Sequence, residues 1–220
     1  MAKVINLVES YVGNAGGSLV VSLLVEFFRI QGRSYLLCDL DRVQPDVWLR
    51  YHCLGSATAD DLSLEDIIDR VELDNCEAIV NVPTVAFERI SAQIAAAIEM
   101  GLLGEVQLRR WLVVVNRKSW ETFERIVDGF EDDFQPILVH NLVDGFELSD
   151  EQYEFCQRRG IVRVPLSWIQ FNDADLELIA ANTTRPLFAF ESELSEKGWS
   201  RLQFFSAHFF DEVIKIVKGV

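Results

Sequence analysis

Short apolar runs alternate with longer segments of helical periodicity along the chain, and this alternation limits the possible folds more than any other feature. Apolar runs predict strands at 4–8, 34–40, 78–82, 110–115, 136–140 and 161–164. The segments between and after them predict helices at 18–30, 64–71, 88–103, 119–130, 150–159, 174–181 and 197–217. Strands that alternate with helices indicate βαβ units. We therefore expect an α/β fold: a doubly wound, mostly parallel sheet with helices on both faces, in three α/β/α layers.

Local signals mark the ends of some predicted helices. Leu19, Leu23, Phe27 and Ile30 share one face of the first helix. Gly32 is predicted as the C-cap of that helix, and Ser63 as the N-cap of the next.

Nothing in the sequence divides the 220 residues into separate units. Half of the residues are hydrophobic and 11% are aromatic, which is enough for a packed core. No internal repeat, low-complexity tract or Pro/Gly/Ser linker interrupts the pattern. We expect residues 1–220 to form a single domain.

The charge excludes one class of function. Asp and Glu number 35 against 20 Lys and Arg, giving a net charge of −15. Sequence-blind DNA binding needs a cationic face, so direct DNA binding is not expected. The apolar stretches are too short for a transmembrane helix, and the first residues do not form a signal peptide, so we expect a cytoplasmic protein. The four cysteines lack the CxxC spacing of a zinc site.

A glycine-rich turn, Gly13-Asn14-Ala15-Gly16-Gly17-Ser18, follows the first predicted strand and precedes a helix. Phosphate-binding loops occupy this place, because backbone N–H groups and the helix dipole converge there. The second strand ends in Asp39-Leu40-Asp41. Together these features indicate a nucleotide site at the carboxyl ends of the strands.

The arrangement resembles the ParA/MinD-like P-loop ATPases, whose loop reads KGGxGK[ST] and whose second strand ends in D-x-D. Aligned without a gap, the resemblance implies that residues 13–18 bind the nucleotide and that Asp39 positions the attacking water. It also implies that Ser18, Asp39 and Asp41 hold Mg²⁺. The nucleotide-binding set comprises Gly13, Asn14, Ala15, Gly16, Gly17 and Ser18. Residues 79–83 and 164–187 resemble later family segments. The middle of the chain, at 113–116 and 137–141, resembles the plasmid stability and conjugal-transfer (StbB/TraL-like) branch.

Departures from the family pattern lie at the charged positions. Val12 and Gly17 replace the two lysines, and Asn81 replaces an acidic residue. Each electrostatic donor of this kind stabilises a transition state by roughly 3–4 kcal/mol. We therefore do not expect efficient hydrolysis from this degenerate loop.

Alternatives remain open at the same residues. The glycine turn can close strand onto helix with no ligand, retain residual nucleotide or phosphate binding, or hydrolyse nucleotide. Asp39 and Asp41 can act in a site or simply cap the residues that follow. Gly17 or Val12 can also be an engineered substitution.

Two functions follow from the resemblance. The first is a regulatory or scaffolding partner, a pseudo-ATPase, in plasmid maintenance, plasmid partition or conjugative DNA transfer. It would bind ATP or ADP with Mg²⁺, or no nucleotide, and contact a basic DNA-binding or transfer-machinery protein or a second copy of itself. The second is a weak Mg-ATP-dependent ATPase whose lysine comes from Lys3, Lys118 or a partner.

Other segments have simpler interpretations. Arg109–Arg110, Arg117–Lys118 and Arg158–Arg159 could form a small cationic edge, but scattered surface charge is favoured. Residues 116–119 are interpreted as a strand-end turn rather than a base-reading motif. In the last helix, Phe204, Phe205, Phe209 and Phe210 occupy more than one face. Packing on the sheet explains two of them. A purely core role is favoured for the set, and a dimer or partner surface is the alternative. Trp48 and Tyr51 are expected to anchor a loop over the core.

Overall fold

The computed structural model describes residues 3–13, 15–51, 57–58, 62–129, 133–167 and 169–219. Its strands form one seven-stranded sheet in the order β3-β2-β4-β1-β5-β6-β7. Every neighbouring pair is parallel. The strands are β1 (Val4–Ser10), β2 (Tyr35–Asp39), β3 (Ala57–Thr58), β4 (Glu77–Val82), β5 (Gln107–Val114), β6 (Gln135–Asn141) and β7 (Val162–Leu166). The predicted parallel sheet is confirmed.

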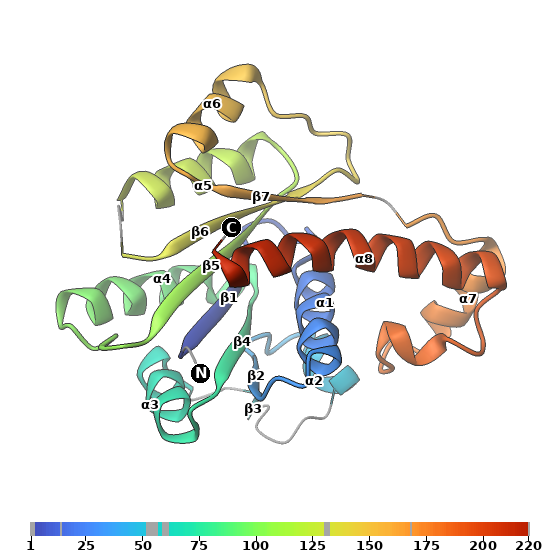
Figure 1. Cartoon of the computed structure of the whole chain (residues 1–220), viewed down its shortest axis with the longest axis horizontal. Helices are drawn as coiled ribbons and strands as arrows, with labels where there is room; N and C mark the ends of the chain where they lie inside the picture. Colours follow the sequence, from blue (N-terminus) through green and yellow to red (C-terminus); the bar gives the residue numbers. More distant parts are fainter. Residues whose placement is uncertain are drawn as a thin grey trace.

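Helices cover both faces of this sheet, so the three-layer architecture is confirmed as well (Figure 1). One face packs against α1 (Gly17–Ile30), α2 (Asp46–Tyr51) and α8 (Glu196–Lys218). The other packs against α3 (Leu64–Asp74), α4 (Thr84–Glu99), α5 (Arg117–Gly129) and α6 (Asp150–Arg158). Strands that are covered on both faces are apolar along nearly their whole length, which explains the continuous apolar runs in the sequence.

Two helices begin as local capping chemistry dictates. The Ser63 hydroxyl accepts the Asp66 N–H at 3.1 Å, and the Asp66 carboxylate accepts the Ser63 N–H at 2.8 Å. Ser149 and Gln152 form the equivalent reciprocal pair at the start of α6. This capping box satisfies N–H groups that have no partner inside the helix, so the prediction at Ser63 is confirmed.

The end of α1 differs from the prediction in two details. Gln31 is the C-cap, and Gly32 follows it with a φ of +62°, a left-handed conformation that suits glycine. Ile30 is 64% exposed rather than buried with the predicted face. The reason is that α1 packs against the sheet, α2 and α8 only as far as Phe28, so its last turn projects into solvent.

A second, smaller core lies beside the sheet. Phe190, Leu194 and Leu202 form its centre, between α7 (Asp173–Ala181), the 3-10 helix η1 (Leu187–Phe190) and the first half of α8. Figure 1 shows α7 at the far end of α8, away from the strands. In α8, Phe205 and Phe209 are buried while Phe204 is 69% exposed, so the favoured expectation of a purely core role is wrong for Phe204. The reason is that the four rings lie on more than one face of the helix, and only one face meets the sheet.

No helix among the described residues is both long and apolar enough to cross a membrane.

Candidate functional site

The glycine-rich loop lies at the carboxyl end of β1 and leads directly into α1, as the sequence predicts. Gly16 caps the helix with a φ of +97°, and its carbonyl accepts the N–H groups of Leu19 and Val20, each at 3.1 Å. A left-handed residue at this point favours glycine. Asn14 lies outside the described residues.

Gly17, which the resemblance aligns with the lysine of ParA/MinD-like loops, has little free space around it. A Cβ atom on Gly17 would lie 2.3 Å from the Ser10 Oγ. The Ser10 Oγ itself is buried, and it has no hydrogen-bond partner among the described residues. Any side chain on Gly17 would therefore require Ser10 to move.

Asn141, at the end of β6, holds the other side of the loop. Its Nδ2 donates to the Ala15 carbonyl at 2.7 Å, and its Oδ1 accepts the Val143 N–H at 3.0 Å. A Cβ on Gly16 would lie 3.0 Å from the same Nδ2. The sequence analysis recorded Asn141 only as a strand end, although an amide after a buried strand is a signal for such a contact.

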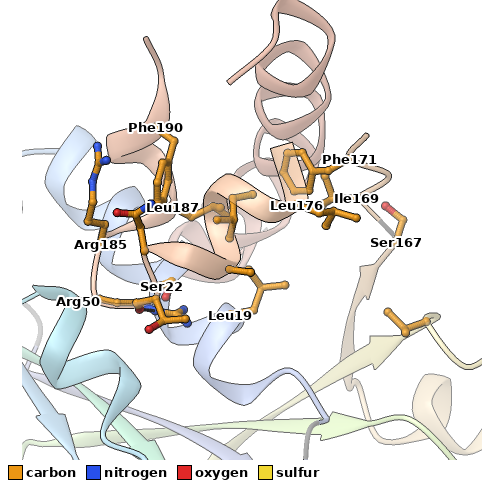
Figure 2. A pocket seen from close by; sticks show the side chains of 15 residues that line it. Leu19, Ser22, Arg50, Ser167, Ile169, Phe171, Leu176, Arg185, Leu187 and Phe190 are labelled. Carbon is orange, nitrogen blue, oxygen red and sulfur yellow. Dashed lines mark hydrogen bonds between the residues drawn. The ribbon is translucent and has the colours of Figure 1, made fainter. Parts of the chain in front are cut away.

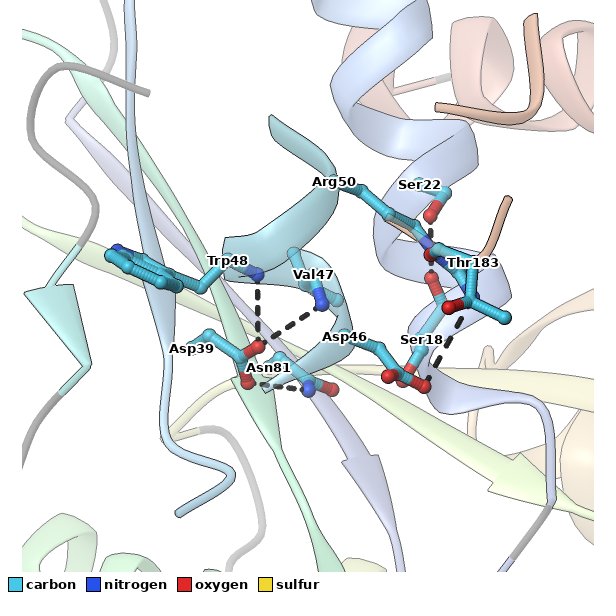
Figure 3. Close-up of polar contacts among 9 residues, drawn as sticks. All are labelled: Ser18, Ser22, Asp39, Asp46, Val47, Trp48, Arg50, Asn81 and Thr183. Carbon is cyan, nitrogen blue, oxygen red and sulfur yellow. Dashed lines mark hydrogen bonds and ion pairs between the residues drawn. The ribbon is translucent and has the colours of Figure 1, made fainter. Parts of the chain in front are cut away.

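Asp39 is fully buried at the end of β2 and accepts four hydrogen bonds (Figure 3). Its Oδ1 accepts from the Asn81 Nδ2 at 2.8 Å and from the Asp41 N–H at 3.1 Å. Its Oδ2 accepts the N–H groups of Val47 and Trp48, both at 3.1 Å. Burial raises the pKa of the Asp39 carboxyl, and the hydrogen bonds oppose that shift. Asp39 thus fastens the first turn of α2 to the sheet.

Asp41 is half-buried and shapes the turn that precedes α2. Its Oδ1 accepts the N–H groups of Val43 and Gln44, both at 2.9 Å. This is an Asx-type use of the carboxylate, in which the side chain replaces backbone partners in a turn. The capping interpretation of both aspartates therefore describes contacts that are present.

These contacts decide how well a Mg²⁺ ion fits. A carboxylate offers about four lone-pair positions, and the four donors around Asp39 use them. No group of three or more His, Cys, Asp or Glu side chains able to hold a metal occurs in the part of the chain that the structure describes. Asp39 does not fit as a magnesium ligand in this arrangement.

The two lysines considered as replacements lie at opposite ends of β1. The Lys118 Nζ, at the start of α5, lies 5.4 Å from the centre of the Tyr11 ring, directly after β1. Lys3 precedes β1 and lies 3.9 Å from Glu105. Of the two, only Lys118 contacts a residue between β1 and the glycine-rich turn, and that residue is Tyr11.

A buried ion pair behind the loop escaped the sequence analysis. Arg110 donates from Nε and Nη2 to the two carboxylate oxygens of Glu9, at 2.7 and 2.6 Å, and both side chains are almost fully buried. Arg109 is buried as well and donates to Gln135. For Arg109 and Arg110 the favoured interpretation as scattered surface charge is therefore wrong, and so is the cationic edge, because both side chains are buried. The sequence shows a Glu and an Arg inside two apolar strands, which indicates buried charges. That they pair with each other could not be predicted, because it depends on which strands are neighbours in the sheet.

At the end of β5, Ser119 accepts the N–H groups of Val115 and Asn116 at 3.0 and 3.1 Å. The strand-end-turn interpretation of residues 116–119 matches these contacts.

The parallel sheet and the glycine loop after its central strand define a P-loop NTPase-like fold. The MinC:MinD cell division protein complex of Aquifex aeolicus matches with a TM-score of 0.60 and 13% identity, over 99% of this chain and 96% of that chain. A plasmid partition protein of Borrelia burgdorferi B31 bound to AMPPNP matches with a TM-score of 0.50 and 11% identity, over 100% of both chains. No protein-family model and no curated protein matches the sequence. These likenesses establish the fold.

Proposed function

We propose that residues 1–220 form a single ParA/MinD-like domain with a degraded nucleotide site. It acts in the cytoplasm as a regulatory or scaffolding partner in plasmid maintenance, plasmid partition or conjugative transfer. The observation that carries the proposal is the Ser10 side chain, which occupies the space beside Gly17 where a P-loop lysine would start. The fold shared with MinD and with a plasmid partition protein supports the cellular role. The finer StbB/TraL-like assignment rests on the apolar and polar pattern of the middle strands.

The missing positive charge supports a pseudo-ATPase. Phosphoryl transfer depends on positioning and on cations that neutralise the transferred group. Here the loop offers backbone groups and the Ser18 hydroxyl, while Gly17 supplies no charge and the Asp39 oxygens accept protein N–H groups. ATP or ADP, where it binds, would stabilise an interface rather than be turned over.

The overall charge supports a basic protein partner. A net charge of −15 attracts cationic surfaces and repels DNA phosphates. One structural neighbour was solved as a MinC:MinD complex. By that analogy we propose a basic DNA-binding or transfer-machinery protein, or a second copy of this chain, as the partner.

A second function is favoured by one contact. The Lys118 Nζ lies 5.4 Å from the centre of the Tyr11 ring, two residues before Gly13, and this contact supports the alternative. A rotation of this side chain toward the loop would supply the charge that Gly17 lacks. The alternative is therefore a weak Mg-ATP-dependent ATPase that uses Lys118.

Isothermal titration with Mg-ATP and Mg-ADP, followed by steady-state phosphate release with and without basic candidate partners, separates the two functions. Turnover at ordinary ATPase rates would overturn the pseudo-ATPase proposal. Under the alternative, Lys118→Ala abolishes turnover. Lys197→Ala, which changes an exposed lysine in the first turn of α8, should leave it intact.

A further inference from the structure

A cavity of about 370 Å³ opens between α1, the end of β7 and the α7–η1 segment (Figure 2). Its wall is predominantly apolar, and the main contributors are Leu19, Ile169, Phe171, Leu176, Ile179 and Leu187. Pockets of this size and character are typical of small-molecule sites. The cavity joins the small core beside α7 to the core of the sheet, because residues of both clusters line it.

The cavity is separate from the glycine-rich loop. None of the described loop residues, Gly13 and 15–18, lines it. Leu19, the residue directly after the loop, does line the cavity, and its N–H donates to the Gly16 carbonyl at 3.1 Å. Ser22 also borders the cavity, and its Oγ donates back to the Ser18 carbonyl at 2.8 Å. The cavity and the loop are therefore neighbours that share no described residue.

Polar groups around the cavity are largely engaged with the protein's own backbone. Ser22 donates to Ser18, and the Asn182 Nδ2 donates to the Leu178 carbonyl at 2.8 Å. The Thr183 carbonyl accepts the Arg50 Nε at 2.9 Å. A purine, with several donors and acceptors on its edge, would find few free partners here, and each buried unpaired group weakens binding about tenfold or more. The wall suits an aliphatic or aromatic body.

Two arginines border the cavity, and they differ in how closely an acidic side chain pairs with them. Arg185 forms a two-pronged ion pair with Glu193, at 3.1 and 2.6 Å. Arg50 donates its Nε to Thr183 and approaches the Asp46 carboxylate only at 4.0 Å. A guanidinium carries five N–H donors in a geometry that matches a carboxylate. Arg50 is therefore the group that can receive an anionic ligand.

We propose that this cavity binds a small amphipathic monocarboxylate, with its apolar body among the side chains of α1 and α7 and its carboxylate at Arg50. The proposal does not depend on the function of the loop. The apolar wall would supply affinity, and Arg50 would fix the orientation of the ligand.

Isothermal titration of the full chain with sodium hexanoate, octanoate and decanoate, each below its micelle concentration, tests the proposal. Each added CH₂ that enters the cavity should tighten binding about fourfold, from about 0.8 kcal/mol per buried methylene. An affinity that does not change with chain length would overturn it.

Two neighbouring alanines of α7 give a matched pair of variants. Ala180 lines the cavity, while Ala181 is exposed and does not line it. Ala180→Trp should abolish octanoate binding, and Ala181→Trp should leave it unchanged. Equal binding by both variants, or equal loss in both, would contradict the site.

Arg50→Gln tests the carboxylate without filling the cavity. It should weaken octanoate binding about tenfold and leave 1-octanol binding unchanged, since a neutral ligand does not use the guanidinium charge. Equal losses for the two ligands would contradict the proposed orientation. Adenosine serves as the competitor: if it binds and displaces octanoate, the cavity is a base site and the proposal is wrong.

Discussion

The loop after β1 and the cavity beside α7 both lie beyond the carboxyl ends of the strands, and both border α1. They differ in the space and the free contacts that they leave for a ligand. In the loop, the protein's own side chains take the available contacts: Ser10 fills the space at Gly17, and Asn141 binds Ala15. The cavity remains open, with apolar walls. The difference teaches that a glycine-rich turn at the carboxyl end of a strand can be occupied by the protein's own side chains while an apolar cavity next to it stays open.

The first prediction concerns the hydrogen bonds of Asp39, where the effect should be largest. Asp39→Ala leaves the N–H groups of Val47 and Trp48 and the amide of Asn81 without their acceptor. We expect the free energy of unfolding to fall by about 3 kcal/mol in urea denaturation, since each buried unsatisfied group costs about 1–3 kcal/mol.

Asp41→Ala is the control for Asp39, because its two hydrogen bonds are exposed. Its cost should be below about 1 kcal/mol. If the two variants lose equal stability, the structural role assigned to Asp39 is wrong.

The second prediction concerns the close approach at Gly17. Gly17→Ala brings a Cβ to 2.3 Å from the Ser10 Oγ. Overpacking typically costs about 1–3 kcal/mol, and because a rotation of the Ser10 hydroxyl can relieve this contact, we expect a loss of about 1 kcal/mol. Thermal and urea unfolding measure it.

Two comparisons sharpen the Gly17 result. Gly13→Ala should be nearly neutral, because a Cβ there meets no atom within 4 Å. Ser10→Gly should recover most of the loss in a double-mutant cycle. Additive effects of the two substitutions would show that Ser10 does not fill the space at Gly17.

Features that depend on local sequence could be predicted, whereas contacts between elements that are distant in the sequence could not. Strands buried on both faces are continuous apolar runs in the sequence, so six of the seven strands and most helices are predicted within a few residues. The two-residue strand β3 is too short to give such a run. The short α2 was missed because its first turn is held by Asp39, a contact from another element. The absence of a lysine at Gly17 was evident, but Ser10 as the group in its place required three-dimensional placement.

The third and smallest effect is a pH dependence at Glu26, on the face of α1 that is packed against α2. Burial raises the pKa of Glu26 above its ordinary value, against the opposing effect of Arg29. The folded state therefore holds this proton more tightly than the unfolded state. Its stabilising contribution is complete below the unfolded pKa near 4.5 and is lost as pH rises through the higher folded value.

Glu26→Gln should accordingly flatten the fall in the free energy of unfolding as pH rises above about 4.5. The exposed Glu88→Gln, on α4, serves as the control and should keep the slope of the wild type. A Glu26→Gln profile parallel to the wild type would show that the Glu26 carboxyl does not titrate in this way.

Steady-state phosphate release from Mg-ATP by the wild-type chain tests the central claim most directly, with Ser18→Ala measured beside it. A degraded site predicts release at the rate of the protein-free control for both proteins. Turnover at ordinary ATPase rates in the wild type that disappears in Ser18→Ala would contradict the claim, because it would show a working phosphate loop at Gly13–Ser18.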